Sequence, residues 1–369
     1  MADFRIPPIS TLVGSTLPNF FRVLNEGRVD PGYYHKVFLS TLVCLISNAF
    51  MPWERYRENY QQVEIRKPIF ILGHWRSGTT LLHNFLCKDP NMSFITTYQS
   101  LFPHNMYSKW LFKSFVRWKI PDKRPTDEVD LGANLPQEDD FAMTNITSAF
   151  YEFFFFPENY RKLYDQHISF TKNRGHKEEW LAAYDYLIKK ALVNRQGDLP
   201  VLKNPANTGR LDVLFSHYPD ARFVHIFRNP VLVYLSTKKF FLSLFPTVQL
   251  QKTSHQQIVN LIVDLYGALM RDYLDKKPTI PTSQLVEIRF EEFEKDPLSY
   301  LSETYCHFDM KQWPQVMPIM KSYCQHLRDY KKNVYSISKT ELERITKEWS
   351  FAFKAFNYDV PENLEITDA

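Results

Sequence analysis

Cysteine is scarce in this chain of 369 residues, and its four cysteines are scattered without a C-x-x-C pair: Cys44, Cys87, Cys306 and Cys324. The spacing excludes a recognisable disulfide framework or zinc site and favours reduced core side chains. The N-terminus also lacks a basic, apolar and small-residue leader pattern. We therefore expect a cytoplasmic protein that holds no metal.

Net charge is small as well, at +4. This argues against a nucleic-acid binder and says little about a small anionic ligand. A basic and aromatic run from Lys109 to Arg124 is compatible with a nucleic-acid surface, but we favour a solvated amphipathic helix. The sequence shows no internal repeat and no low-complexity linker, and it leaves the oligomeric state open.

A hydrophobic run long enough to cross a membrane is missing near the N-terminus. Residues Val37 to Met51 are uncharged, but they fall short of the ~20 residues that a spanning helix needs. The run also contains hydroxyl and amide side chains. We therefore predict a buried helix here, and peripheral contact with a membrane surface is the alternative.

Aromatic residues are abundant, at 16% of the chain with 30 Phe and 21 Tyr. A chain of this length buries a sizeable core and has enough aromatic residues to line an apolar pocket. We expect one domain over residues 1–369, with helical terminal regions at 1–67 and 301–369. Between them, a core at 68–300 carries a largely helical insertion at 88–200.

The central motif lies between Pro68 and Leu86. An apolar run, Ile69 to Leu72, is typical of a buried parallel strand and ends at Gly73. Gly78 follows, and apolar residues then recur at helical spacing. A strand, a tight glycine loop and a helix start present backbone N–H groups to a phosphate. An ordinary strand–helix turn is the alternative.

A kinase-type phosphate loop would place Lys directly after its second glycine, where this chain has Thr79. The segment Arg76-Ser77-Gly78-Thr79-Thr80 instead resembles the 5′-phosphosulfate loop of sulfotransferases. These enzymes use 3′-phosphoadenosine 5′-phosphosulfate (PAPS) as the sulfuryl donor and release 3′-phosphoadenosine 5′-phosphate.

A second motif, Phe227-Arg228-Asn229-Pro230, follows another apolar run, and Ser236 lies eight residues after Arg228. In sulfotransferases an Arg and a Ser in this arrangement bind the 3′-phosphate. The resemblance spans about residues 68–300 and is closest to the broad bacterial-type group. His225, within the preceding apolar run, is interpreted as a hydrogen-bonded core residue.

The resemblance implies an α/β fold, in which a three-layer, P-loop-like parallel sheet is flanked by helices. It implies that the loop residues Arg76, Ser77, Gly78, Thr79 and Thr80 bind the nucleotide together with Arg228 and Ser236. Lys332 and Asn333 are candidates to close over it; a solvated charge cluster that includes Lys331 is the alternative.

For catalysis, Arg76 and Lys203 are candidates to stabilise the charge on the leaving group, and ground-state phosphate binding is the alternative role. Many relatives carry a His four residues after the Lys of Lys-x-Pro, where this chain has Asn207. For the general base we rank Glu138 first, with Asp139, Asp140 and His104 as alternatives. The alternative interpretation is that residues 137–140 serve only to cap a helix that begins near Phe141.

The acceptor is predicted to be a hydrophobic small-molecule alcohol, a sterol or lipid alcohol ahead of a phenol or a carbohydrate. The prediction depends on the aromatic run Phe150 to Pro157 in the insertion, although such runs usually form a core. A P-loop kinase or nucleotide triphosphatase, and a non-catalytic binding protein, are the alternatives of other classes.

Overall fold

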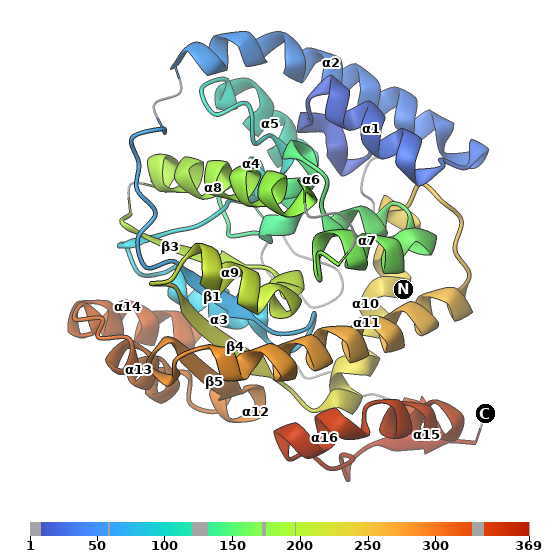
Figure 1. Cartoon of the computed structure of the whole chain (residues 1–369), viewed down its shortest axis with the longest axis vertical. Helices are drawn as coiled ribbons and strands as arrows, with labels where there is room; N and C mark the ends of the chain where they lie inside the picture. Colours follow the sequence, from blue (N-terminus) through green and yellow to red (C-terminus); the bar gives the residue numbers. More distant parts are fainter. Residues whose placement is uncertain are drawn as a thin grey trace. The chain divides into compact units, whose positions relative to one another are not determined.

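Three of the apolar runs pair as a parallel sheet in the computed structural model of the chain (Figure 1). These strands are β1 (Ile69–Leu72), β4 (Arg222–Phe227) and β5 (Leu285–Arg289), and β4 lies between the other two. Ile71 is in register with Val224, and His225 is in register with Glu287. The predicted parallel strands are confirmed, and their carboxyl ends therefore meet at one edge of the sheet.

The structure describes residues 9–57, 60–119, 132–171, 175–195, 197–326 and 336–368. The chain divides into two compact units. The first unit contains residues 1–65, 93–202 and 240–258, and the second unit contains residues 66–92, 203–239 and 259–369. The candidate nucleotide residues Lys332 and Asn333, with Lys331, lie outside the described residues.

Helices connect and follow the strands of the second unit: α3 (Thr79–Leu86), η5 (Pro205–Arg210), α9 (Leu211–His217), α10 (Pro230–Val248), α11 (His255–Lys276), η6 (Lys277–Thr279), η7 (Thr282–Gln284), α12 (Phe290–Phe293), α13 (Pro297–His307) and α14 (Trp313–His326), where η marks a 3-10 helix. The end of α10 and the start of α11 fall within residues 240–258 and so belong to the first unit. The last segment adds β6 (Ser336–Ser338), α15 (Lys339–Glu348), α16 (Ser350–Phe356) and β7 (Glu365–Thr367). β6 and β7 pair in parallel, and neither was predicted. Glu341 on α15 accepts hydrogen bonds from Tyr234 and Lys238 on α10, at 2.7 and 2.5 Å.

The first unit is largely helical, as predicted for the N-terminal region and the insertion: η1 (Thr11–Gly14), α1 (Leu17–Gly27), η2 (Pro31–Tyr33), α2 (Tyr34–Arg57), α4 (Thr97–Leu101), α5 (Lys109–Lys119), α6 (Asp139–Ile146), η3 (Phe150–Phe154), η4 (Pro157–Asn159), α7 (Tyr160–His167) and α8 (Gly175–Arg195). Two short strands, β2 (Met92–Ser93) and β3 (Leu199–Lys203), mark the two ends of the insertion.

The aromatic run in the insertion is core. Phe150 and the four residues Phe153 to Phe156 are buried, and the ring of Phe154 meets those of Phe241 and Phe245 at 5.4 and 5.6 Å between centroids. These rings fill the interior of the first unit. The run therefore does not by itself identify an acceptor pocket.

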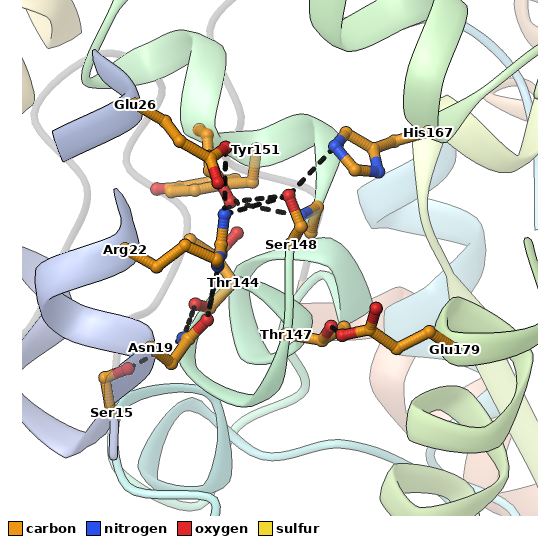
Figure 2. A network of polar contacts seen from close by, with 12 residues as sticks. Ser15, Asn19, Arg22, Glu26, Thr144, Thr147, Ser148, Tyr151, His167 and Glu179 are labelled. Atoms are coloured by element: carbon orange, nitrogen blue, oxygen red, sulfur yellow. Dashed lines mark hydrogen bonds and ion pairs between the residues drawn. The ribbon is translucent and has the colours of Figure 1, made fainter. Parts of the chain in front are cut away.

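A buried polar network fixes the same segment (Figure 2). Glu152, which is buried, accepts a hydrogen bond from Arg22 of α1 at 2.9 Å. Arg22 also donates to Ser148 at 3.0 Å, and the Ser148 hydroxyl lies 3.0 Å from Nε2 of His167 on α7. Burial raises the pKa of Glu152, and the Arg22 guanidinium opposes that rise. The network joins α1, the aromatic segment and α7.

The helix α2 differs from the prediction. We expected a buried helix between Val37 and Met51, but much of its outward face is exposed, with Phe38 at 64% and Ile46 at 52%. By length and composition alone, two helices of the described chain are apolar enough to cross a membrane, at residues 31–54 and 230–248. Only 28% of the apolar window in the first is buried, against 56% in the second. The prediction of a buried helix is wrong.

Candidate nucleotide site

The loop between β1 and α3 requires glycine at both of its ends. Gly73 has φ +136° and Gly78 has φ +102°, values that other residues rarely adopt. A Cβ atom on Gly73 would lie 2.3 Å from the carbonyl oxygen of Ile226 on β4. A Cβ atom on Gly78 would lie 2.2 Å from the ring of Phe290. The glycines therefore let the loop lie close to the sheet edge.

The loop leads into α3 without a capping side chain. Gly78 occupies the position before the first helical residue and makes no side-chain hydrogen bond there. First-turn N–H groups have no partners inside a helix, and the helix dipole is positive at this end. Thr79 is buried and Thr80 is half-buried. The predicted strand, loop and helix start is confirmed, and this geometry suits an anion.

The hydroxyl of Ser77 takes part in the shape of the loop. Its Oγ donates to the His74 carbonyl at 2.7 Å and lies 3.0 Å from the Ile226 carbonyl of β4. The Gly73 N–H is bonded to the Thr208 hydroxyl at 2.8 Å. These bonds fix the loop against its neighbours, and contact between Ser77 and a phosphate stays a prediction.

The two predicted phosphate motifs meet in the second unit. Arg76, with φ +71°, donates from Nε to the hydroxyl of Ser236 at 2.9 Å. Arg228 donates from Nη1 to the Arg76 carbonyl at 3.3 Å. Arg76 and Ser236 are 160 residues apart in sequence. Two cationic side chains and a buried hydroxyl thus gather beside the loop.

The Arg228 guanidinium packs on an aromatic ring, and one of its N–H groups has no hydrogen-bond partner among the described residues. Its guanidinium lies over Phe290, 4.7 Å from the ring centroid. Its Nε is buried and has no hydrogen-bond partner among the described residues. A buried guanidinium N–H without a partner is costly, so this atom indicates a place where a ligand oxygen would bind. The planar fork of Arg suits phosphate oxygens.

His74 contributes no positive charge to the loop. Its ring is buried against Tyr266, 5.2 Å away, and Nδ1 lies 2.9 Å from the Trp75 carbonyl. Burial lowers the pKa of the His74 imidazole to about 4, although the bond to Trp75 raises it. The ring is therefore neutral near pH 7, and the charge of the loop comes from Arg76.

Lys203 is the last residue of β3 and is buried. Asn207, four residues on, stands where the resemblance led us to look for a His. Its side-chain oxygen accepts from Arg210 at 2.9 Å, and the whole side chain is buried. A neutral amide cannot act as a base, and this one serves to hold a buried Arg.

The acidic run of the first unit surrounds the start of α6. Glu138 precedes the helix, is half-buried and makes no side-chain capping bond. Asp139 accepts from the Tyr184 hydroxyl, and Asp140 accepts from the Tyr151 N–H, both at 2.7 Å. Asp139 and Asp140 are thus buried structural acceptors in the first turn. Glu138 remains the first candidate base, as a prediction.

His104 lies between two hydrogen-bond partners. Nε2 is 3.3 Å from the Asn145 carbonyl, and Nδ1 is 3.2 Å from the Tyr186 hydroxyl. A carbonyl only accepts, so Nε2 carries the hydrogen and Nδ1 of the neutral ring accepts from Tyr186. Both nitrogens of His104 are therefore engaged, and its role as an alternative base stays a prediction.

Two contributors were missed from the sequence. Phe290, the residue directly after β5, contacts both Gly78 and Arg228, and it was not among the predicted site residues. His74 was not singled out either.

The interpretation of His225 as a hydrogen-bonded core residue is wrong in one respect. His225 is a buried core residue, but its ring stacks on Tyr273 at 3.8 Å and is 3.8 Å from Glu287, too far for a hydrogen bond.

Known proteins are similar to this chain in sequence and in fold. The family model described as the sulfotransferase family matches residues 68–315. Curated relatives from Mycobacterium tuberculosis and Mycobacterium bovis, both named omega-hydroxy-beta-dihydromenaquinone-9 sulfotransferase Stf3, are 27% identical over 367 residues. Each alignment covers 97% of this chain and 94% of the relative.

Solved structures share the fold. The crystal structure of sulfotransferase STF1 from Mycobacterium tuberculosis is similar with a TM-score of 0.66 and 19% identity, over 91% of both chains. That of sulfotransferase STF9 from Mycobacterium avium has a TM-score of 0.67 and 14% identity, over 95% of this chain and 98% of that one. At these identities the likeness concerns the fold alone.

Proposed function

This chain belongs to the sulfotransferase family, and we propose that it transfers a sulfuryl group from PAPS to the hydroxyl of a lipid-like alcohol. The transferase class follows from the family. The donor, the acceptor and the roles of individual residues are the proposal, and the kinase and non-catalytic alternatives are set aside by the family match.

The cluster of Arg76, Arg228 and Ser236 beside the glycine loop carries the donor assignment. PAPS bears a 5′-phosphosulfate and a 3′-phosphate, so it needs two anion sites. The loop and Arg76 are assigned to the first, and Arg228 with Ser236 to the second. The buried Arg228 Nε without a partner among the described residues fits a phosphate oxygen.

When bound, PAPS supplies the sulfuryl group and leaves as 3′-phosphoadenosine 5′-phosphate. The acceptor oxygen forms the new S–O bond as the bond to the phosphate oxygen breaks. Arg76 and Lys203 are proposed to stabilise the negative charge that builds on that phosphate oxygen. Glu138 is proposed to take the proton of the acceptor hydroxyl. No step calls for a metal ion, so activity should survive a chelator.

A lipid alcohol is favoured as acceptor over a phenol or a carbohydrate. The curated relatives are named for a hydroxylated dihydromenaquinone, an isoprenoid quinone derivative, and they align with almost the whole of this chain. The buried aromatic segment adds no independent support, because its rings form core. We also propose a cytoplasmic location, because all four cysteines are free.

A sulfuryl transfer screen tests this function. The purified chain is incubated with PAPS and with isoprenoid alcohols, hydroxylated quinones, sterols, phenols or glycans, and sulfated products are detected by mass. We expect product only with the lipid-like alcohols. Product with glycans alone would overturn the acceptor assignment and keep the donor, whereas a failure to bind 3′-phosphoadenosine 5′-phosphate in calorimetry would overturn the donor assignment.

A further inference from the structure

The buried face of the helix α2 is mixed in character. It packs Cys44 and Met51 into the interior, and it also carries polar side chains, among them Lys36, Ser47 and Glu54. Lys36 donates to the Thr247 carbonyl at 2.9 Å, and Ser47 donates to Asn105 at 2.6 Å. Glu54 accepts from the Ser108 N–H at 2.6 Å. Polar groups thus help to anchor the helix to the first unit, and they take up part of the face that an ordinary surface helix fills with apolar residues.

The opposite face of α2 is exposed and apolar. The large exposed side chains are Tyr34, Phe38, Leu42, Leu45, Ile46 and Trp53. At 100° per residue these positions share an arc of about 120° on the helix surface. No Asp, Glu, Lys or Arg lies on this arc, and the helix is 24 residues long. Single exposed apolar residues are ordinary, but a continuous stripe of this length marks an interaction surface.

A basic and aromatic helix borders this stripe. The Glu54 carboxylate accepts hydrogen bonds from the backbone N–H groups of Tyr107 and Ser108, just before α5, at 2.7 and 2.6 Å. Phe112 of α5 meets Phe50 of α2 at 5.8 Å between ring centroids, so this side of α5 faces α2. The two helices are therefore neighbours within the first unit.

The exposed residues of α5 include a basic side chain beside aromatic and apolar ones. Trp110 is exposed at 68%, and Lys109 beside it is exposed as well. Tyr107 lies edge-on to Trp53 with 6.5 Å between ring centroids. The α5 sequence contains four basic residues and no acidic residue. Trp, Tyr and Lys beside an apolar stripe are the composition of a membrane-interface segment.

We propose that the exposed faces of α2 and α5 bind the surface of an anionic lipid bilayer. The apolar stripe enters the boundary between headgroups and acyl chains, and the exposed Lys109 of α5 faces the anionic headgroups. A second copy of the chain is disfavoured as occupant, because α5 would then place like charges together without an acidic counterpart on the stripe. Peripheral membrane contact, which was the alternative interpretation of Val37 to Met51, is therefore the role that we propose for α2.

This inference deepens the proposed function. A lipid alcohol resides in a bilayer, so an enzyme that modifies it gains by binding to the bilayer surface. Lipid binding by α2 does not require the donor site, because α2 and α5 belong to the first unit and the glycine loop to the second. The two proposals therefore fail independently.

The test is co-sedimentation of the full chain with phosphatidylcholine vesicles, with and without phosphatidylglycerol. The disrupting variant is Phe38→Glu with Ile46→Glu. The matched control is Met317→Glu with Ile319→Glu, which adds the same charge at two exposed apolar residues of α14, each 39% exposed. We expect binding to mixed vesicles, weakened by salt, and lowered about tenfold or more by the disrupting variant.

The control variant should bind vesicles as the parent chain does, and both variants should bind 3′-phosphoadenosine 5′-phosphate normally. Absence of parent binding to mixed vesicles would overturn the inference, as would equal loss in both variants or none in the disrupting one. A self-association that only the disrupting variant abolishes, seen by analytical ultracentrifugation without vesicle binding, would assign the stripe to a second copy instead. Vesicle binding without nucleotide binding would contradict the proposed donor while keeping this inference.

Discussion

Replacing Gly78 with alanine tests how the glycine loop is held. The change opposes two features of the position, a positive φ of +102° and the ring of Phe290 at 2.2 Å from the new Cβ. A left-handed conformation costs a residue with a Cβ about 1–2 kcal/mol. Overpacking against a buried ring costs about 1–3 kcal/mol more. We therefore expect the free energy of unfolding to fall by about 2–5 kcal/mol.

The same change should weaken nucleotide binding through the ring. The Arg228 guanidinium packs on the Phe290 ring, 4.7 Å from its centroid, so displacement of the ring should move Arg228. Urea unfolding gives the stability, and calorimetry with 3′-phosphoadenosine 5′-phosphate gives the affinity. The control is Gly32→Ala, where a Cβ meets nothing within 4 Å. This variant should match the parent within about 0.5 kcal/mol.

A double variant separates the two costs. In Gly78→Ala with Phe290→Ala the ring is absent, so only the backbone strain remains. The alanine at position 78 should then cost less than it does in the parent background. An equal cost in both backgrounds, or a parent-like Gly78→Ala variant, would refute the contact between loop and ring.

Three further results are expected. Glu138→Gln should lower turnover by about 10²-fold and leave nucleotide affinity intact, as steady-state kinetics and calorimetry would show, whereas near-normal turnover would end its assignment as base. Ser236→Ala should weaken binding of 3′-phosphoadenosine 5′-phosphate by about tenfold, because a hydrogen bond to a charged group is lost, and unchanged calorimetry would exclude Ser236 from the site. The pKa of His74 is lowered to about 4 in the folded state, so the unfolded state binds protons first as pH falls below about 6.5. The free energy of unfolding should therefore drop by about 2 kcal/mol between pH 7 and 5. In urea unfolding of His74→Asn, that part of the drop should vanish.

The nucleotide loop could be predicted because its signals are local. The apolar run before Gly73 is long enough for one strand, and two glycines five residues apart define the loop that follows. That Arg76 and Ser236 meet also follows from order, since each lies after a strand of one parallel sheet. The role of Phe290 could not be predicted, because it depends on how three strand ends pack together.

The failure at α2 has a different cause. Periodicity identifies a helix, but it does not tell which face a neighbour covers. The hydroxyl residues Ser40 and Ser47 of the run face the protein interior. A buried helix would also place the apolar residues between them in the core, whereas Leu42, Leu45 and Ile46 lie on the outward stripe. The error shows that polar residues can anchor a helix whose apolar face is exposed.

The central claim is that the glycine loop, Arg228 and Ser236 form a site for a nucleotide with a 3′-phosphate. Calorimetry of the parent chain and of Arg228→Ala, with 3′-phosphoadenosine 5′-phosphate and with adenosine 5′-phosphate, tests it most directly. The account predicts that the variant loses affinity for the bisphosphate by about tenfold or more and changes little toward the monophosphate. Equal losses for both ligands, or no binding of the bisphosphate to the parent chain, would contradict it.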